Sequence, residues 1–235
     1  MLQTLKNWLG QRFATVENHH NLERLPAPKL PAGQPLADIR LIVLDLETTG
    51  LSPSKDQVIA IGAVAVDGLQ IPLKDQFDLI LRRPELDIRE TVLIHGIGSE
   101  ALTRGHETED ALLYLLEWMN GDPILAFHSA FDQKFLEKSL KQTLGYSQPH
   151  TWLDVAELLP ALFPDADVGR GRLDNWVDHF GLEVSERHHA AADALVTAEL
   201  TLIALNQATK NGITTLSELN DKLRYFRRLK AMSRQ

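Results

Sequence analysis

Four carboxylates from three separate segments of the chain have the residue types and spacing of a metal site. Asp45 and Glu47 follow a run of aliphatic residues in LIVLDLETTG, residues 41–50. Asp132 lies in AFHSAFDQKFL, and Asp193 lies among alanines in RHHAAADALVTAELTLIAL. A carboxylate beside a hydrophobic core is costly unless it is paired or bound to a metal. Since side chains two apart on a strand share a face, the first pair should converge at a strand's carboxyl end, where α/β sheets often build their sites.

The chemistry that these ligands favour is phosphoryl transfer assisted by two divalent cations. Mg²⁺ and Mn²⁺ prefer oxygen ligands and usually keep waters, which leaves room for a substrate phosphate. Two such ions about 4 Å apart hold the attacking and leaving oxygens of a displacement. The chain has no cysteine, which excludes disulfides, thiolate zinc sites and cysteine-held clusters. Neither zinc nor an iron–sulfur centre is therefore expected.

Length and charge narrow the class of protein. With 235 residues, the chain can form one sizeable domain with extensions. Its apolar runs are too short to cross a bilayer, and the first residues, MLQTLKNWLGQRF, lack the features of a signal peptide. We therefore expect a cytoplasmic protein without a membrane partner. The net charge of −8 argues against coating duplex nucleic acid through bulk positive charge, but it allows a local nucleic-acid site.

The elements that must position these residues follow from hydrophobic periodicity and turn signals. Strands are predicted at Arg40–Glu47 and in the segments VIAIGAVAV, DQFDLIL and PILAFH. Helices are predicted over Thr108–Asn120, Phe131–Gln142, Val155–Leu162, Leu173–Phe180 and Ala190–Gln207. Three leading strands, followed by alternating helices and strands, predict an α/β fold with a mixed sheet flanked by helices.

The two ends of the chain differ in character from its middle. Apolar residues at helical spacing predict a short N-terminal helix, and the prolines of LPAPKLPAGQP predict an extended linker after it. We divide the chain into this helix and linker, a single catalytic domain, and a C-terminal basic helix, at residues 1–36, 37–208 and 209–235.

The C-terminal helix is predicted to begin with a capping box formed by Thr215 and Glu218. Residues 221–235 contain six Lys or Arg and one Asp. One interpretation is a solvated helix face. The other is a contact with a phosphate backbone or a docking surface for a partner.

Four motifs occur in a characteristic order, namely VLDLETTGL, LIHGI, FHSAFDQKFL and RHHAAADA. In this order and at these separations they resemble the His-bearing branch of the DEDD superfamily of 3′-to-5′ exonucleases, which includes the proofreading epsilon subunit of bacterial DNA polymerase III. Weaker agreement in WLDVAELLP and RLDNWVDHFGL extends the resemblance over about residues 38–206. The resemblance implies a ribonuclease-H-like fold.

The resemblance also implies roles for individual residues. Asp45, Glu47, Asp132 and Asp193 would hold the two metal ions, and His188, five residues before the last aspartate, would be the general base. The residues implied in binding the terminal nucleotide are Thr48, Thr49 and Leu51 of the ETTGL turn, His95 of LIHGI, and Phe131.

Several of these positions have a second interpretation. His95 could be a turn histidine and Phe131 a core residue, while Asp154 and Asp174 are interpreted as helix caps. His189, four residues before the last aspartate, could share its helical face. The family that the chain resembles typically has Asn where this chain has His128, so the resemblance does not imply that Asn's substrate contact, or the substrate preference that goes with it, for this chain.

Three functions remain after these steps. The first is a metal-dependent exonuclease that releases nucleoside 5′-monophosphates from the 3′ end of single-stranded DNA, in proofreading or repair. The alternative is an exoribonuclease that trims RNA or oligoribonucleotides, since the metal motifs do not detect the 2′-hydroxyl group. The third is a catalytically silent interaction module, which an intact set of five site residues argues against. Besides the nucleic-acid 3′ end, the expected partner is a protein that binds the terminal helices.

Overall fold

The computed structural model describes residues 22–30, 33–86, 92–169, 171–184 and 187–232. The predicted N-terminal helix lies outside these ranges. Among the helices in the described ranges, none has the length and apolar character needed to span a membrane.

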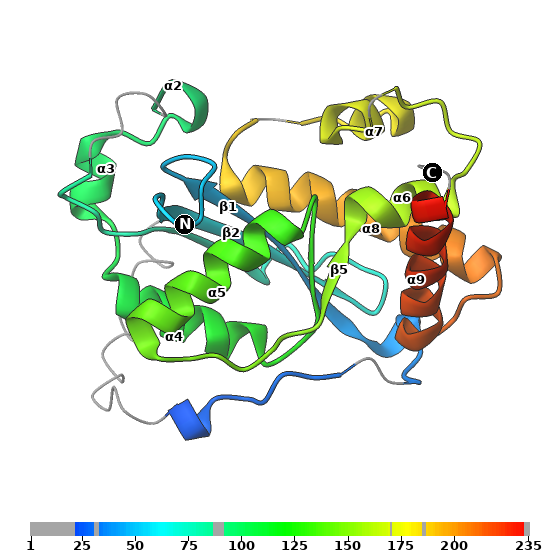
Figure 1. Ribbon diagram of the computed structural model, residues 1–235, viewed down its shortest axis with the longest axis horizontal. Helices are drawn as coiled ribbons and strands as arrows, with labels where there is room; N and C mark the ends of the chain where they lie inside the picture. Colours follow the sequence, from blue (N-terminus) through cyan, green and yellow to red (C-terminus); the bar gives the residue numbers. More distant parts are fainter. Residues whose placement is uncertain (1–21, 31–32, 87–91, 170, 185–186, 233–235) are drawn as a thin grey trace.

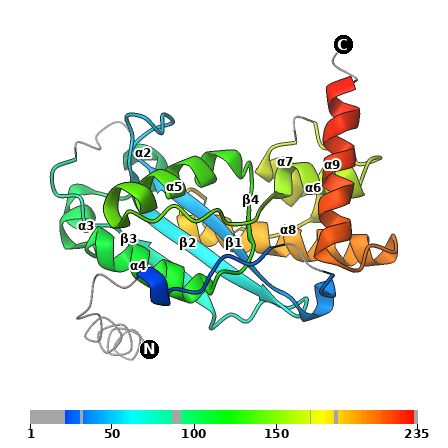
Figure 2. The ribbon, with the colours of Figure 1, turned by 60° about the horizontal axis from the view of Figure 1, so that its bottom comes forward.

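A five-stranded mixed sheet forms the centre of the molecule (Figures 1 and 2). Its strands, in the spatial order β3-β2-β1-β4-β5, are β3 (Gln76–Ile80), β2 (Val58–Asp67), β1 (Arg40–Thr48), β4 (Ile124–Ala126) and β5 (Trp152–Asp154). The first three pair antiparallel, whereas β4 pairs parallel with both β1 and β5. The predicted mixed sheet is confirmed, with β5 as an additional short strand.

Helices cover both faces of this sheet. They are α2 (Val92–His95), α3 (Ser99–Arg104), α4 (Thr108–Met119), α5 (Ala130–Leu144), α6 (Val155–Leu162), α7 (Leu173–Phe180), α8 (Ala190–Lys210) and α9 (Leu216–Met232), with 3-10 turns at Leu22–Arg24 and Leu36–Asp38. Buried residues of α4 and α5 pack on one face, and those of α6, α7, α8 and α9 pack on the other. Figure 2 shows the sheet between these two layers.

The side-chain alternation of β1 divides the core in two. Ile42 and Leu44 pack with α4 and α5, whereas Leu41 and Val43 face the layer that contains α8. Because successive side chains of a strand alternate between faces, Asp45 and Glu47 lie on the same face as Leu41 and Val43, toward α8. The acidic end of β1 therefore faces α8.

Gly62 allows α8 to begin directly against the sheet. This glycine is the β2 residue paired with Asp45. A Cβ atom at Gly62 would come within 2.1 Å of the backbone carbon of Ala190 and 2.2 Å of the backbone nitrogen of Ala191. Such an overlap is forbidden, so only a glycine at this position permits this close approach. The first turn of α8, which carries Asp193, can therefore lie next to Asp45.

The C-terminal helix α9 packs on the same core as α8, through a buried stripe of leucines, Leu216, Leu219 and Leu223. Its start is a capping box, as predicted. The backbone N–H of Thr215 donates to Glu218 Oε2 at 3.0 Å, and the backbone N–H of Glu218 donates to Thr215 Oγ1 at 3.3 Å. The division of the chain at residues 36 and 208 stays a prediction.

Candidate active site

Asp45, Glu47 and Asp193 lie together where β1 meets the start of α8. One ligand oxygen from each residue lies within 4.8 Å of the other two. Asp193 is buried and the two β1 residues are half-buried. A set of oxygen donors gathered in this way fits a hard divalent cation.

Asp132 approaches the same strand from α5. Its Oδ1 atom accepts a hydrogen bond from the backbone N–H of Leu46 at 3.2 Å. Since β4 pairs with β1 only at Ile42 and Val43, a side chain can bond the backbone of β1 beyond that point. Asp132 is buried there. It lies outside the close group of three, but its charge helps to raise the pKa of Asp45.

Burial and repulsion between carboxylates raise the pKa values of Asp45, Glu47 and Asp132. For Asp45 the largest cause is desolvation, followed by the charges of Asp132, Asp193 and Glu47, and its pKa lies well above the usual value. Desolvation and the charge of Asp193 raise the pKa of Glu47 to about 7, and desolvation raises the pKa of Asp132 to about 8. A cation placed among these groups would favour their ionised forms.

Arg187, which was not predicted from the sequence, contacts this group of carboxylates. The Arg187 guanidinium forms an ion pair with Asp193, and its Nε atom donates to Asp174 Oδ1 at 2.7 Å. Its charge opposes the raised pKa of Glu47. Within the described part of the chain, Arg187 is the one Lys or Arg paired with these carboxylates. The N-cap residue of α7 is Arg172, so the interpretation of Asp174 as a cap is wrong.

The backbone at the start of α8 separates the two adjacent histidines. His188 has a left-handed backbone conformation, with φ of 61°, and its N–H donates to Asp193 Oδ2 at 3.1 Å. His189 has an extended backbone and is the N-cap residue of α8. Burial raises the pKa of Asp78 on β3, and the charge of His189 opposes this shift. Thus His188 is tied to the acidic group, whereas His189 lies near the edge strand β3. Both side chains are exposed.

The ETTGL turn directly follows the acidic end of β1. Thr48 Oγ1 donates to the carbonyl oxygen of Gly50 at 2.7 Å, and Thr49 Oγ1 accepts the N–H of Gln57 at 3.0 Å. Both hydroxyl groups therefore stabilise the turn itself. Leu51 is 85% exposed, which leaves its side chain available to a ligand. The substrate contacts of these three residues stay predictions.

His95 and Phe131 are packed more closely. The His95 side chain is buried, and its Nδ1 accepts the N–H of Ile97 at 3.1 Å. Its Nε2 is also buried and has no partner among the described residues. Ile97 packs with Ala60 at the acidic end of the sheet. The Phe131 ring lies 4.7 Å from the Phe135 ring, against the core. Their predicted substrate contacts are untested, but the unpartnered Nε2 is available for one.

His128 lies in the turn between β4 and α5 with φ of 63°. Among residues other than glycine, Asn, Asp and His enter this left-handed region most readily. An Asn at this position, as the resemblance implies, would meet this backbone requirement, and His meets it as well. The N–H of His128 donates to Asp154 Oδ1 at 3.0 Å, and that atom also accepts the N–H of Ala156 at 2.9 Å. The interpretation of Asp154 as a helix cap is confirmed.

Solved structures define the class of protein to which this fold belongs. Escherichia coli exonuclease I in complex with a dA16 oligonucleotide has a TM-score of 0.64 at 18% identity, over 74% of this chain and 42% of that chain. The nuclease domain of 3′hExo, a DEDDh family member bound to rAMP, has a TM-score of 0.62 at 17% identity, over 74% of this chain and 94% of that chain. The predicted ribonuclease-H-like fold is confirmed.

Sequence comparison gives the family. The RNase_T family model, described as exonuclease, matches residues 42–201. The chain is 33% identical over 182 residues to the PolC-type DNA polymerase III of Thermotoga maritima, and 30% identical over 184 residues to that of Bacillus subtilis. Each match covers 77% of this chain but only 13% or 12% of the relative, so the chain spans about an eighth of the relatives' length. The chain belongs to the exonuclease family, which confirms the predicted class of enzyme, a 3′-to-5′ exonuclease.

Proposed function

We propose that this exonuclease depends on divalent metal ions and removes nucleoside 5′-monophosphates from the 3′ end of single-stranded DNA. The observation that carries the proposal is the group of Asp45, Glu47 and Asp193, within 4.8 Å of one another, in a chain whose residues 42–201 match the exonuclease family. The curated relatives are DNA polymerases, and one solved neighbour is bound to a DNA oligonucleotide. Both support a DNA substrate, in proofreading or repair.

Two divalent cations, Mg²⁺ or Mn²⁺, fit the site because its carboxylates offer oxygen donors and the pKa values of Asp45, Glu47 and Asp132 are raised. Asp45, Glu47, Asp132 and Asp193 would hold these ions, which supply water activation and neutralise charge at the phosphate when bound. Arg187 already pairs with Asp193. Cation binding therefore competes with this ion pair and with the protons on the carboxyl groups.

His188 is the proposed general base. Its imidazole accepts a proton from the water whose oxygen attacks the phosphorus of the last phosphodiester. The bond from phosphorus to the 3′-oxygen of the preceding nucleotide then breaks, and the terminal nucleotide leaves with its 5′-phosphate. A neutral imidazole has a ring nitrogen that can accept this proton. The backbone bond from His188 to Asp193 holds the base beside the carboxylates.

The terminal nucleotide would lie between the ETTGL turn and the segment around His95. Leu51 offers exposed apolar surface for the base, and the buried Nε2 of His95 lacks a partner in the described structure. Neither contact reads a particular base, so we expect low sequence specificity. Trimming of RNA is the second candidate, because the carboxylates do not contact a 2′-hydroxyl group and the 3′hExo structure is bound to rAMP.

A gel assay with 5′-labelled single-stranded DNA and RNA of equal sequence tests this proposal. We expect stepwise shortening of the DNA from its 3′ end when Mg²⁺ or Mn²⁺ is present and none in EDTA. Undiminished cleavage in EDTA would contradict the metal requirement. Faster trimming of RNA than of DNA would select the second candidate, and stability of both substrates would indicate a silent module.

A further inference from the structure

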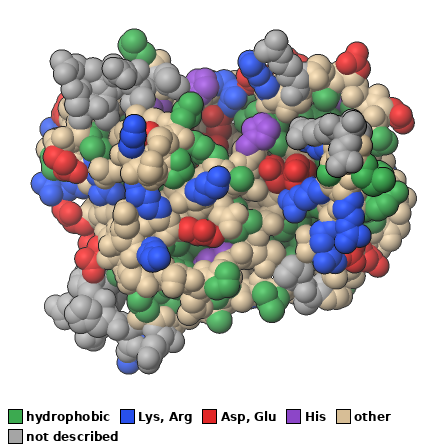
Figure 3. Space-filling view, in the orientation of Figure 1, with side chains coloured by type: hydrophobic (Ala, Val, Ile, Leu, Met, Phe, Trp, Pro, Cys, Tyr) green, Lys and Arg blue, Asp and Glu red, His purple; other side chains and the backbone are tan. Residues whose placement is uncertain are grey.

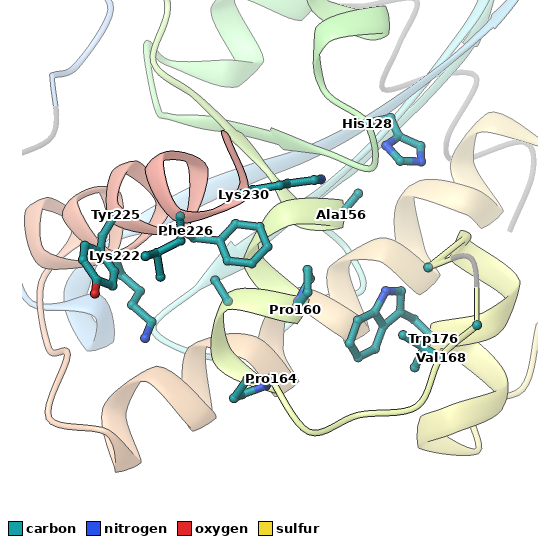
Figure 4. Close-up of a pocket in the computed structure, with 14 residues that line it drawn as sticks. His128, Ala156, Pro160, Pro164, Val168, Trp176, Lys222, Tyr225, Phe226 and Lys230 are labelled. Carbon is teal, nitrogen blue, oxygen red and sulfur yellow. The ribbon is translucent and has the colours of Figure 1, made fainter. Parts of the chain in front are cut away.

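A pocket of about 800 Å³ lies beside α9, away from the group of carboxylates. It is bounded by α6, α7, α9 and the turn between β4 and α5 (Figure 4). The residues that give it its chemical character are His128, Trp176, Lys222, Tyr225, Phe226 and Lys230.

Helix α9 carries more apolar surface than its packing requires. Its leucine stripe is buried in the core, which is sufficient to hold an amphipathic helix in place. Beside this stripe, Tyr225 is 58% exposed and Leu229 is 47% exposed. Both line the pocket, as does Phe226. An exposed aromatic and aliphatic surface in a concave site is typical of a binding surface.

The polar groups of the pocket favour a ligand that has acceptors and negative charge. No acidic side chain is found among the described residues that line it. The Nε1 atom of Trp176 is buried and has no acceptor among the described residues, and a Cβ atom at Gly171, another lining residue, would lie 3.9 Å from it. A buried N–H without a partner is costly, so this donor indicates where a ligand acceptor is missing.

Positive charge adds to this preference. Figure 3 shows basic side chains gathered where Figure 1 places α9. Arg224 and Arg227 are already paired, with Asp221 and Glu157 respectively. No ion pair is found for Lys222 within the described residues, and Figure 4 shows Lys230 directed from α9 toward the side of the pocket where His128 lies.

The turn at His128 connects this pocket with the candidate active site. The N–H of His128 bonds the carboxylate of Asp154. His128 lies directly before α5, whose first turn carries the proposed metal ligand Asp132. A strand that leaves the active site past the start of α5 would reach the pocket.

We propose that this pocket is a second nucleic-acid subsite, which holds nucleotides on the 5′ side of the one being removed. Lys222 and Lys230 contact phosphates, Tyr225 and Phe226 stack on bases, and the Trp176 N–H donates to a phosphate or base oxygen. A proline-rich peptide could also lie on the aromatic side chains, but it would give Lys222 no anionic partner. This proposal rests on the proposed exonuclease function, because the subsite would bind a further part of the same DNA strand.

The test compares a trinucleotide with a single strand of about twelve nucleotides, a length that can fill both sites, for the full chain and for Lys222→Glu. The control is Lys74→Glu, which makes the same charge change at an exposed position in the connection between β2 and β3. For Lys222→Glu we expect KM for the long substrate to rise about tenfold and its salt dependence to weaken. The trinucleotide should be cleaved at the wild-type rate, and Lys74→Glu should affect neither substrate.

Equal loss on both substrates, or no loss on either, would overturn the subsite. If the wild type cleaves nothing, the exonuclease proposal fails. Binding of the labelled long strand, measured by fluorescence anisotropy, then tests the subsite proposal by itself. In that case the subsite predicts about tenfold weaker binding by Lys222→Glu than by Lys74→Glu. Unchanged binding would leave the pocket to another ligand, such as a proline-rich peptide.

Discussion

Both ends of β1 collect carboxylates, and the two ends differ in how these charges are balanced. At the amino end, Arg40 forms ion pairs with Asp75 at 3.1 Å and with Asp122 at 2.8 Å. Lys29 adds a second cation 2.5 Å from Asp122, and the Trp118 indole N–H donates to Asp75 at 2.8 Å. Asp75 and Asp122 are therefore each paired with a cation, and Arg40 connects the two carboxylates.

At the carboxyl end of β1, the described residues provide one arginine for four carboxylates. Arg187 pairs with Asp193, while burial and mutual repulsion raise the pKa of Asp45, Glu47 and Asp132. The difference teaches that acidic residues near a strand do not by themselves mark a site. An excess of carboxylates over cations does indicate a site. Burial and mutual repulsion disfavour the ionised carboxylates, and a bound cation would offset this cost.

The largest expected effect is the loss of activity when a carboxylate is removed from the carboxyl end of β1, compared with the same change at its amino end. Asp45→Asn should reduce exonuclease activity by about 10³-fold or more, because it removes a metal ligand from which several kcal/mol of transition-state stabilisation derive. The matched change Asp75→Asn should leave kcat nearly unaltered. The gel assay measures both variants, and circular dichroism checks their folding. Similar activities for the two variants would remove the functional distinction between the ends.

The next effect distinguishes the two histidines at the start of α8. His188→Ala should lower kcat by about 10²–10⁴-fold, the usual contribution of a positioned base. His189→Ala should have a mild effect, since that side chain lies toward Asp78. The pH–rate profile should change shape in the His188 variant, because the proposed base is then absent. An inactive His189 variant beside a nearly normal His188 variant would reverse the assignment.

The comparison also shows which features could be predicted from sequence. The bounds of α6 and α7 were predicted as they are observed, because their apolar residues repeat with helical period between clear end signals. The short elements β5, α2 and α3 were missed, since three to six residues are too few to show a period.

The same limit applies to the site. The four carboxylates stand out in sequence because each interrupts an apolar segment, and the structure brings three of them together. Arg187 lies in a polar stretch where an arginine is ordinary, and its contact with Asp174 depends on how the chain returns from α7 to α8. Likewise, the pairing of Asp75 with Arg40 spans two strands of the sheet. Sequence periodicity contains no information on such long-range side-chain contacts.

A change at the amino end should alter stability and spare catalysis. Arg40→Met keeps an apolar stem over Trp118, where the guanidinium now lies 4.9 Å from the ring centroid, but it leaves the buried Asp122 carboxylate with Lys29 alone. We expect a loss of about 2 kcal/mol in the free energy of unfolding, less than for a fully buried pair because Arg40 is partly exposed. A thermal melt should show a fall of about 4–8 °C. A loss of activity without a loss of stability would contradict this.

The smallest expected effect is a pH dependence confined to the carboxyl end of β1 in metal-free protein. The pKa of Glu47 rises from 4.5 to about 7 on folding, and that of Asp132 rises from 3.8 to about 8. Between these limits the folded protein holds protons that the unfolded chain has lost. The contribution of these groups to stability is therefore complete below about pH 4 and decreases as pH rises to about 8.

In EDTA, the wild type should lose a few degrees of melting temperature between about pH 6 and pH 8, since solvent screening limits the effect at the half-buried Glu47. Glu47→Gln removes one of the ionising groups, so its melting temperature should change less over this range, whereas Asp75→Asn should follow the wild type. Mg²⁺ or Mn²⁺ should raise the melting temperature of the wild type more at pH 8 than at pH 6, because fewer protons then compete for the carboxylates. Equal pH slopes for the wild type and Glu47→Gln would show that repulsion at this end of β1 does not limit the stability of the metal-free protein.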